Sequence, residues 1–321
     1  MSPTEGTWDR AVRALDQAER IGIVGHVRPD GDALGSAIAL ALAARGAGKN
    51  AVVSFGEPFA IGQEFRFLDQ SVLVPPSEFS GDFDLVVVCD TGNLDRVGSV
   101  GSVVQAADRV LVIDHHVTEG DLGDVRVVDP KAAATTQLVH ELLTRIGWDV
   151  TRPIAEALYV GLVTDTGRFQ YSSTSTDVHR LAADLLAAGV ETAPIGQMLY
   201  EETPFGYFAV VARVLGRARL EEDAGLVWSV LRQDDLREAG IPWEAADPLI
   251  DLVRLAREAG VACLLKETRP GIIKGSLRSR GTVDVAEIAA AFHGGGHRNA
   301  AGFTTELDVE QTIARILELL A

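Results

Sequence analysis

Apolar and polar positions follow two different patterns along the chain. Up to about residue 190, short apolar runs typical of buried strands alternate with longer stretches of helical spacing. The strand-like runs are residues 20–27, 50–56, 84–90 and 109–116. The helical stretches include an Ala/Leu-rich segment at 33–44, and two segments in which Leu or Ile recurs every four residues, at 138, 142 and 146 and at 154, 158 and 162. Strands separated by helices predict an α/β fold with a doubly wound, mainly parallel sheet.

A second pattern begins near residue 215. Short apolar runs at 225–231, 261–267, 271–279 and 301–307, with two or three helices between them, predict a smaller α+β domain with a partly antiparallel sheet. Residues 177–199 are expected to be helical, with breaks at Gly189 and Pro194. We therefore expect a first domain over residues 1–190, a connector over 191–215 and a second domain over 216–321.

Composition narrows the class of protein. A chain of 321 residues is long enough for two domains, each with its own core. The longest apolar segment, 33–44, is too short to span a membrane, and the N-terminal segment lacks the apolar core of a signal peptide, so a soluble cytoplasmic protein is expected. Cys89 and Cys263 lie in apolar stretches and are expected to be buried thiols. The net charge of −17 argues against a surface that binds long nucleic acid.

The triplet Asp114, His115 and His116 ends the apolar run 109–113. Because that run is predicted to be a buried strand, the triplet is expected where an open α/β sheet presents side chains to a ligand. A carboxylate and two imidazoles are costly to bury unless something pairs with them. The triplet therefore indicates a charged ligand, most simply a metal ion.

Residues 25–36 (GHVRPDGDALGS) form another polar cluster after a predicted strand. His26 lies at the strand end, and Asp30 and Asp32 flank Gly31 before a helix begins. Taken singly, Asp32 could be a helix cap, Asp30 a turn residue and His26 incidental. Their convergence within seven residues favours ligand binding instead.

Two further aspartates occupy comparable positions. Asp90 ends the run 84–90, where an aspartate is commonly a cap for the next helix, but it shares its position at a strand end with His26 and Asp114. Asp165 follows the helical run that starts at Ile154, and a carboxylate at the negative end of a helix dipole is better explained by a cation than by capping.

The types of ligand indicate the type of metal. Carboxylates and imidazoles without a thiolate suit Mn²⁺, with Mg²⁺, Co²⁺ or Fe²⁺ as alternatives, better than a structural zinc site. The four carboxylates of Asp30, Asp32, Asp90 and Asp165 would balance two divalent ions. Such a pair of ions is typical of enzymes that activate water for an in-line displacement at phosphorus.

The order of these motifs resembles the DHH phosphoesterase superfamily, in its two-domain form with a C-terminal DHHA1 domain. The resemblance covers residues 15 to 310 and rests on GHVRPDGD, VVVCDTG, VIDHH, TDTGRF and a late GGGH. Within it, the sequence is most similar to the bifunctional oligoribonuclease and pAp phosphatase (nanoRNase) family, which includes members that cleave cyclic di-AMP. The resemblance implies an active-site cleft between the two domains.

The resemblance also implies roles for these residues. His26, Asp30 and Asp90 would hold one metal ion, while Asp32, Asp90, His115 and Asp165 would hold the other, with Asp90 as the bridge. His116 would face the substrate phosphate as a catalytic donor. Asp114 would orient a histidine, the usual role of a carboxylate behind a metal-bound imidazole.

The second domain is expected to bind the substrate. Arg278 and Arg280 lie at i and i+2 on a predicted strand, hence on one face. Residues 293–302 (HGGGHRNAAG) supply Gly294, Gly295 and Gly296, whose backbone N–H groups can approach a phosphate, although a solvated loop would explain a glycine triplet equally well. The resemblance favours phosphate or nucleotide binding, with Arg278 and His297 as the main contacts. His140 and His179 belong to no cluster and are expected to be structural or solvated, and His293 only flanks the glycines.

The expected function is that of an Mn²⁺-dependent phosphoesterase for short nucleotides: oligoribonucleotides of a few residues, pAp, cyclic di-AMP or its linear product pApA. One alternative is an inorganic pyrophosphatase, which the GGGH and SLRS motifs disfavour. Another is a nucleotide sensor without activity, which the complete ligand set disfavours. Members of the family commonly pair, so a homodimer is also expected.

Overall fold

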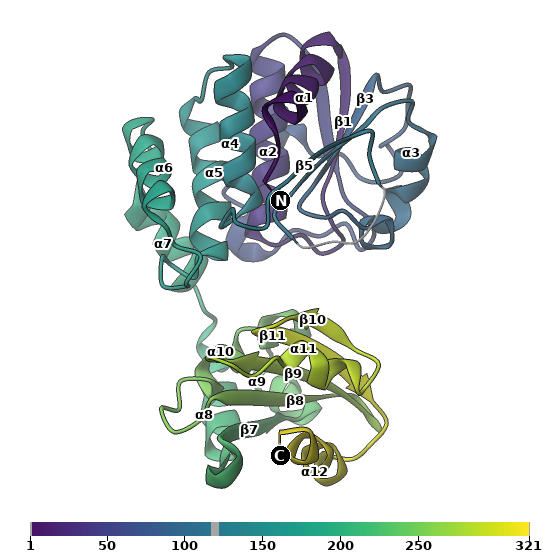
Figure 1. The fold of residues 1–321 in the computed structure, drawn as a ribbon. Coiled ribbons are helices and arrows are strands. Elements are labelled where there is room, and N and C mark those ends of the chain that lie inside the picture. The colour runs from purple at the N-terminus through teal and green to yellow at the C-terminus, as the bar shows by residue number, and fades with distance from the viewer. Residues whose placement is uncertain (1, 117–121, 321) are drawn as a thin grey trace. The chain divides into compact units, whose positions relative to one another are not determined.

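The computed structural model describes residues 2–116 and 122–320, and it divides into two compact units between Glu202 and Thr203. The first unit is an α/β domain and the second an α+β domain, as predicted (Figure 1). The segment 191–215, expected to be a connector, contains helix α7 (Thr192–Tyr200) and most of helix α8 (Phe205–Gly216). Among the described residues, no helix has the length and apolarity that a membrane span requires.

The first unit is built on a five-stranded sheet in which all neighbouring strands are parallel. Its strands are β1 (Arg20–Val24), β2 (Asn50–Ser54), β3 (Leu85–Cys89), β4 (Val110–Asp114) and β5 (Val125–Val128). They lie in the order β2-β1-β3-β4-β5. The direction of winding therefore reverses between β1 and β3, the place where open α/β sheets bind ligands. Four of the strands match the predicted runs, and β5 was not predicted.

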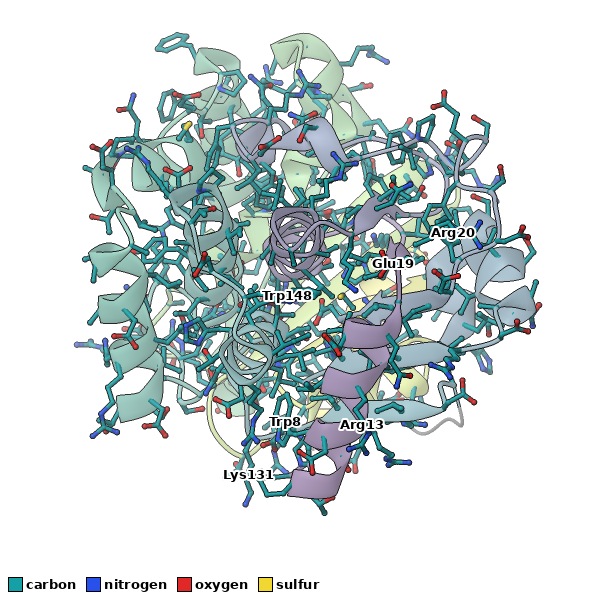
Figure 2. The ribbon with its side chains drawn as sticks, turned by 90° about the horizontal axis from the view of Figure 1, so that it is seen from above. Trp8, Arg13, Glu19, Arg20, Lys131 and Trp148 are labelled. Atoms are coloured by element: carbon teal, nitrogen blue, oxygen red, sulfur yellow. The ribbon has the colours of Figure 1, made fainter. Side chains whose placement is uncertain are left out.

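Helices cover both faces of this sheet. Figure 1 shows α1 (Glu5–Gln17), α2 (Gly31–Gly46), α4 (Thr135–Ile146) and α5 (Arg152–Asp165) on one side and α3 (Gly101–Ala106) on the other. Short 3₁₀ helices span Gln63–Phe65, Gln70–Val72 and Leu94–Val100. Successive residues of each strand point to opposite faces of the sheet and belong to two apolar clusters, one on each face. Ile23 of β1 and Val87 of β3 lie in one cluster, and Val24 and Val88 lie in the other. Trp8 of α1 (Figure 2) lies under the guanidinium of Arg145 of α4, 5.0 Å from the ring centroid.

Helix α2 is buried between the sheet and α5, and small residues allow this close packing. A Cβ atom on Gly35 would lie 2.3 Å from the backbone oxygen of Ala157, and one on Gly31 would lie 2.6 Å from Thr164 Oγ1. Side chains larger than hydrogen would separate the two helices. The contact brings the N-terminal turn of α2 close to the C-terminal end of α5.

Helix α6 (Thr176–Ala187) and helix α7 complete the first unit. The predicted break at Gly189 is present, but the predicted break at Pro194 is wrong. Pro194 is the third residue of α7, and a proline is tolerated in the first turn because its missing N–H would have no partner within the helix.

The second unit contains a six-stranded sheet in the order β10-β11-β9-β8-β7-β6. Its strands are β6 (Arg219–Glu221), β7 (Leu226–Leu231), β8 (Val261–Arg269), β9 (Ile272–Ser279), β10 (Gly295–His297) and β11 (Ala300–Thr305). Strands β7 and β8 are parallel and the other neighbours are antiparallel. Its further helices are α9 (Gln233–Ala239), α10 (Leu249–Val253), α11 (Val285–Ala290) and α12 (Val309–Leu320), with 3₁₀ turns at Glu222–Ala224 and Trp243–Ala246.

Candidate metal centre

The side chains that the sequence singled out in the first unit converge at the carboxyl ends of its strands. His26 lies two residues after β1, Asp90 directly follows β3, and His115 directly follows β4. Because β1 and β3 are neighbours at the point where the winding reverses, His26 and Asp90 are brought together by topology. The N-terminal turn of α2 adds Asp30 and Asp32, and the last residue of α5 is Asp165.

Asp30 and Asp32 have different local roles. Asp30 is the N-cap of α2, and its Oδ1 accepts hydrogen bonds from the backbone nitrogens of Asp32 (3.1 Å) and Ala33 (3.0 Å). The alternative in which Asp32 caps the helix is therefore wrong. Asp32 lies one residue inside α2 and is completely buried, and its two carboxylate oxygens accept from the backbone nitrogens of Thr135 (2.6 Å) and Thr136 (2.9 Å).

The first turn of α4 thus holds the Asp32 carboxylate, as helix N-termini commonly hold anions. Sequence reasoning missed both threonines. A pair of hydroxyl residues before the apolar spacing of a predicted helix was the available signal, but it is usually explained by capping.

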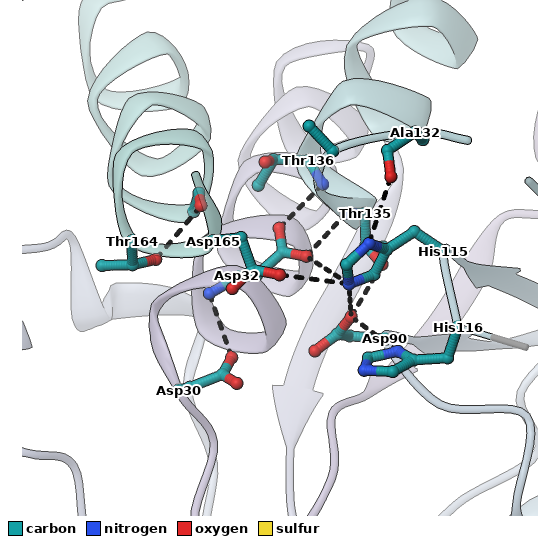
Figure 3. A network of polar contacts seen from close by, with 12 residues as sticks. Asp30, Asp32, Asp90, His115, His116, Ala132, Thr135, Thr136, Thr164 and Asp165 are labelled. Atoms are coloured by element: carbon teal, nitrogen blue, oxygen red, sulfur yellow. Dashed lines mark hydrogen bonds and ion pairs between the residues drawn. The ribbon is translucent and has the colours of Figure 1, made fainter. Parts of the chain in front are cut away.

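Asp90 lies between His26 and His115, and His116 Nδ1 is also 3.6 Å from its Oδ1. Its Oδ2 is 3.5 Å from His26 Nε2, and its Oδ1 is 3.6 Å from His115 Nε2. The hydroxyl of Thr135 donates to Oδ1 at 2.8 Å, in surroundings where both side chains are buried. Asp90 therefore has the position of a bridging ligand, with Oδ2 toward His26 and Oδ1 toward His115. Figure 3 shows the contacts of Asp90 with His115 and Thr135.

Two groups of three ligand atoms flank this bridge. His26, Asp30 and Asp90 form one, and Asp32, His115 and Asp165 form the other, with all ligand atoms in each group within 4.8 Å of one another. In the second group His115 Nε2 is 3.1 Å from Asp165 Oδ2 and 3.7 Å from Asp32 Oδ2. The first group has the same members as one set that the family resemblance implied, and the second group has those of the other set without Asp90, whose Oδ1 is 3.6 Å from His115 Nε2. Asp90, His115 and His116 form a third group that meets the same distance criterion.

The hydrogen bonds of His26 and His115 leave one nitrogen of each ring for a metal. His26 Nδ1 lies 3.0 Å from the backbone oxygen of Val27, and His115 Nδ1 lies 3.3 Å from that of Ala132. Because a carbonyl can only accept, Nδ1 carries the proton and Nε2 of a neutral ring presents a lone pair. Both Nε2 atoms are buried without a hydrogen-bond partner and face carboxylates. Buried polar atoms seldom lack partners, so these residues fit divalent cations.

The pKa values of four side chains in the cluster also indicate a site for cations. Burial would lower the pKa of His26 and His115, but the nearby carboxylates raise each to about 10. Burial, reinforced by the charge of Asp32, raises the pKa of Asp90 to about 8 and that of Asp165 to about 6. All four shifts favour a more positive cluster, and divalent cations supply that charge.

Cys89, the last residue of β3, does not change the expected metal type. Burial and the neighbouring carboxylates of Asp90 and Asp32 raise the pKa of its thiol, so it remains protonated and apolar in character. Cys263 in β8 is a buried free thiol as well. The ligand set is therefore one of carboxylates and imidazoles, which favours Mn²⁺ or Mg²⁺ over a thiolate zinc site.

The two histidines of the triplet have different hydrogen-bond partners. Asp114 Oδ1 accepts from the backbone nitrogen of His116 (3.0 Å) and lies 2.8 Å from its Nδ1. Asp114 thus orients His116, whereas the ring of His115 is oriented by the backbone of Ala132. Burial would lower the pKa of His116, but the hydrogen bond to Asp114 raises it, which favours the imidazolium form. His116 is suited to donate a proton or a hydrogen bond.

Backbone strain marks the loops around this cluster. Among the described residues other than glycine, positive φ angles occur at five positions, which are Arg28 (54°), Asp90 (63°), Arg168 (61°), Phe169 (64°) and His293 (59°). The first four are candidate ligands or lie within four residues of one, and the fifth precedes the glycine triplet. Residues in this region of φ cost about 1 kcal/mol or more each, and such strain is concentrated at functional sites.

In the second unit, the solvated loop that was the alternative for the glycine triplet is not observed: Gly295 and Gly296 belong to the edge strand β10, which pairs with β11. A Cβ atom on Gly294 would lie 2.2 Å from Gly302 O, and one on Gly296 would lie 2.5 Å from Ala300 O, so both glycines are required for strand packing. Gly295 is exposed, and a Cβ atom there would meet nothing within 4 Å. Local packing thus leaves only the middle glycine of the triplet unexplained.

The remaining arginines and histidines that the sequence analysis named lie outside the cluster of His26, Asp90 and His115. Arg278 lies on β9 and donates to the backbone oxygen of Leu277 (3.0 Å), whereas Arg280 follows the strand and donates to the backbone of Arg254. The side chain of His297 lies outside the described part of the chain. His140 is within α4, and the ring of His179 is 5.4 Å from that of Phe169.

Comparisons with known proteins agree with this architecture. The family model described as "DHH family, N-terminal domain" matches residues 20–162, and the "DHHA1 domain" model matches residues 223–321. The chain is 35% identical over 302 residues to the bifunctional oligoribonuclease and PAP phosphatase NrnA of Thermus thermophilus, covering 93% of this chain and 88% of that protein. It is 27% identical over 334 residues to the cyclic-di-AMP phosphodiesterase GdpP of Bacillus subtilis, covering 94% of this chain and 47% of GdpP.

A solved structure shares the whole fold. An exopolyphosphatase-related protein from Bacteroides fragilis matches with a TM-score of 0.93 and 25% identity, covering 99% of this chain and 96% of that one. The resemblance stated from the sequence motifs is therefore confirmed.

Proposed function

This chain belongs to the DHH family of phosphoesterases and carries a DHHA1 domain, and from that premise we propose that it hydrolyses short nucleotides with two divalent metal ions. The proposed substrates are oligoribonucleotides of a few residues and pAp, with cyclic di-AMP or pApA as further substrates. Mn²⁺ is the proposed metal, with Mg²⁺ and Co²⁺ as alternatives.

One observation carries the proposal. The Nε2 atoms of His26 and His115 are buried without hydrogen-bond partners, and the carboxylate of Asp90 lies between them. We assign His26, Asp30 and Asp90 to one ion and Asp32, Asp90, His115 and Asp165 to the other. Ions bound in this way lower the pKa of a water molecule and neutralise the charge on a phosphoryl group.

The protein's own residues carry out the remaining steps. Asp114 accepts a hydrogen bond from Nδ1 of His116, so the Nε2 edge of that ring faces away from Asp114. His116 is the proposed donor to the phosphate, either to the charge that develops on its oxygens or to the leaving oxygen. Thr135 and Thr136 hold the carboxylates of Asp90 and Asp32, so these ligands need not reorganise during the reaction.

Two observations support short nucleotides as substrates. Relatives of the chain are named as an oligoribonuclease and PAP phosphatase and as a cyclic-di-AMP phosphodiesterase. The net charge of −17 disfavours long nucleic acids. Arg278 and the glycines 294–296, with His297, are the proposed phosphate and nucleotide contacts of the DHHA1 domain.

The test is a substrate panel with the purified full chain. Pyrophosphate, pAp, pApA, cyclic di-AMP and oligoribonucleotides of two to five residues are assayed with Mn²⁺, Mg²⁺ or Co²⁺, with EDTA as the blank. Asp90→Asn should lower turnover by roughly a thousandfold because it weakens the bridging ligand. His140→Gln changes a histidine outside the cluster and should retain turnover.

Two outcomes would contradict the proposal. Preferred hydrolysis of pyrophosphate would indicate a pyrophosphatase. An absence of turnover on every phosphoester with all three metals would indicate a binding protein without activity.

A further inference from the structure

Strand β9 presents a row of polar side chains on one face of the second sheet. Lys274, Ser276 and Arg278 are partly exposed, whereas the alternate residues Ile273 and Leu277 are buried. Because side chains on a strand point to opposite faces in turn, the three polar residues share the face opposite the apolar cluster that includes Ile273 and Leu277. Arg278 is one of the proposed nucleotide contacts, so the row extends from it along the strand.

The neighbouring strand leaves this row accessible. On β11, Gly302 lies opposite Ser276 and Ala300 lies opposite Arg278. Gly302 has no side chain and Ala300 has only a methyl group, so a flat ligand could approach the backbone there. The apolar cluster on the same face contains residues of β7 and β8, such as Val227 and Leu264, but no residue of β9 or β11 among those described.

The row carries positive charge that nearby carboxylates do not balance. Lys266 of β8 lies directly opposite Lys274, is 1% exposed, and pairs with Asp247 Oδ1 at 2.5 Å. Within the described part of the chain, neither Lys274 nor Arg278 has a carboxylate within ion-pair distance. Like charges opposite each other on adjacent strands are unfavourable.

The pKa of Lys266 reflects the same excess of positive charge. Burial lowers the pKa of Lys266, and the positive charges of Lys274 and Arg278 lower it further against the opposing effect of Asp247. In a chain with a net charge of −17, a row of this kind is better explained by an anionic ligand than by folding stability.

We propose that Lys274 forms a second phosphate subsite, distinct from the one at Arg278, and that it selects linear oligoribonucleotides over pAp. Four residues along a strand span about 13 Å, so the two cations reach different phosphates. The two phosphates of pAp are attached to one ribose and do not span that distance. Lys266 is too buried to contact the ligand, and Asp247 pairs with it, so Lys274 and Arg278 are the cations that reach the phosphates. This inference rests on the proposed function and specifies its substrate.

The experiment measures binding separately from turnover. Fluorescence anisotropy of a 5′-labelled pentaribonucleotide is followed with the full chain in EDTA, and unlabelled pAp is used as a competitor. The variants are Lys274→Gln, Lys274→Arg and, as a matched control, Arg219→Gln on the exposed edge strand β6 of the same sheet. Thermal unfolding checks that each variant is folded.

Lys274→Gln should weaken pentanucleotide binding about tenfold, the size of one charge-assisted hydrogen bond, and change pAp binding less than twofold. It should also lower the slope of log affinity against log salt concentration by about 0.7, the value for one phosphate contact on a single strand. Lys274→Arg should restore binding, and Arg219→Gln should match the unmodified chain.

Three results would overturn the subsite: equal weakening for pAp and the pentanucleotide, no weakening for either, or no pentanucleotide binding by the unmodified chain. Failure of the proposed function looks different. A chain that hydrolyses no nucleotide but still loses pentanucleotide affinity on Lys274→Gln would keep the subsite and refute the enzymatic activity.

Discussion

Thr135→Val tests how the metal centre is held. The Thr135 hydroxyl donates to Asp90 Oδ1 at 2.8 Å, while its backbone nitrogen donates to Asp32 Oδ2 at 2.6 Å. Valine has nearly the same shape and keeps the backbone contact, so the substitution removes only the hydrogen bond to the proposed bridging ligand. Both partners are buried, and water cannot replace the lost donor.

The expected effect is a loss of metal affinity. Removing a buried hydrogen bond to an ionised group costs about 1.5 to 3 kcal/mol, or about a 10- to 100-fold change in an equilibrium constant. Asp90 already has a pKa raised to about 8, by burial and by the charge of Asp32. Without the Thr135 hydroxyl the pKa should rise further, so more of the protein must release a proton before it binds a cation.

The assay is a calorimetric titration of Mn²⁺ into the chain, paired with an Mn²⁺ activation curve for pAp hydrolysis. Thr136→Val is the matched control, because the Thr136 hydroxyl is buried without a hydrogen-bond partner and its backbone contact to Asp32 is kept. It should leave Mn²⁺ affinity unchanged, and Thr135→Ser should restore most of it. Unchanged affinity in Thr135→Val, or an equal loss in Thr136→Val, would refute the positioning role of the hydroxyl.

Three other substitutions test separate parts of the structure. Gly161→Ala places a Cβ atom 2.7 Å from Asp32 Oδ1 and should weaken Mn²⁺ binding about tenfold or more, as measured by calorimetry. Gly295→Ala meets no steric obstacle and should keep the melting temperature while raising KM for nucleotides; an unchanged KM would count against substrate contact there. Asp235→Asn breaks the Arg217 pair (2.5 and 2.9 Å) and should lower the unfolding free energy by about 1 to 3 kcal/mol at pH 7 in urea titrations. The Arg217 pair outweighs burial and lowers the pKa of Asp235, so its contribution should be full above about pH 4 and be lost as the pH falls through the lowered pKa; equal pH profiles for both proteins would refute this.

The sequence alone predicted both domain types, because strand and helix periods are local properties. Four of the five strands of the first sheet match apolar runs of the sequence. Strand β5 was missed because its residues are mostly half-buried and Arg126 interrupts the run. The break predicted at Pro194 failed because the effect of a proline depends on its place within a helix, and that place is set by where the preceding turn ends.

The sequence also predicted a set of side chains that the structure brings together at one edge of the sheet. Asp30, Asp32, Asp90, His115 and Asp165 were placed at strand and helix ends by pattern, and parallel strands bring such ends to one edge of a sheet. The grouping into two metal-binding sets came from family resemblance and stays a prediction. The structure brings His26, Asp30 and Asp90 together in one group and Asp32, His115 and Asp165 in another.

Tertiary structure decided how these side chains are oriented. Thr135 lies 45 residues from Asp90 and 103 from Asp32 in the sequence, so no local pattern could pair them. The same holds for His115, whose ring is oriented by Ala132, and for the cross-strand pairing of Lys266 with Lys274. A sequence pattern specifies the period and exposed face of each element, whereas the packing of distant elements determines which donor reaches which carboxylate.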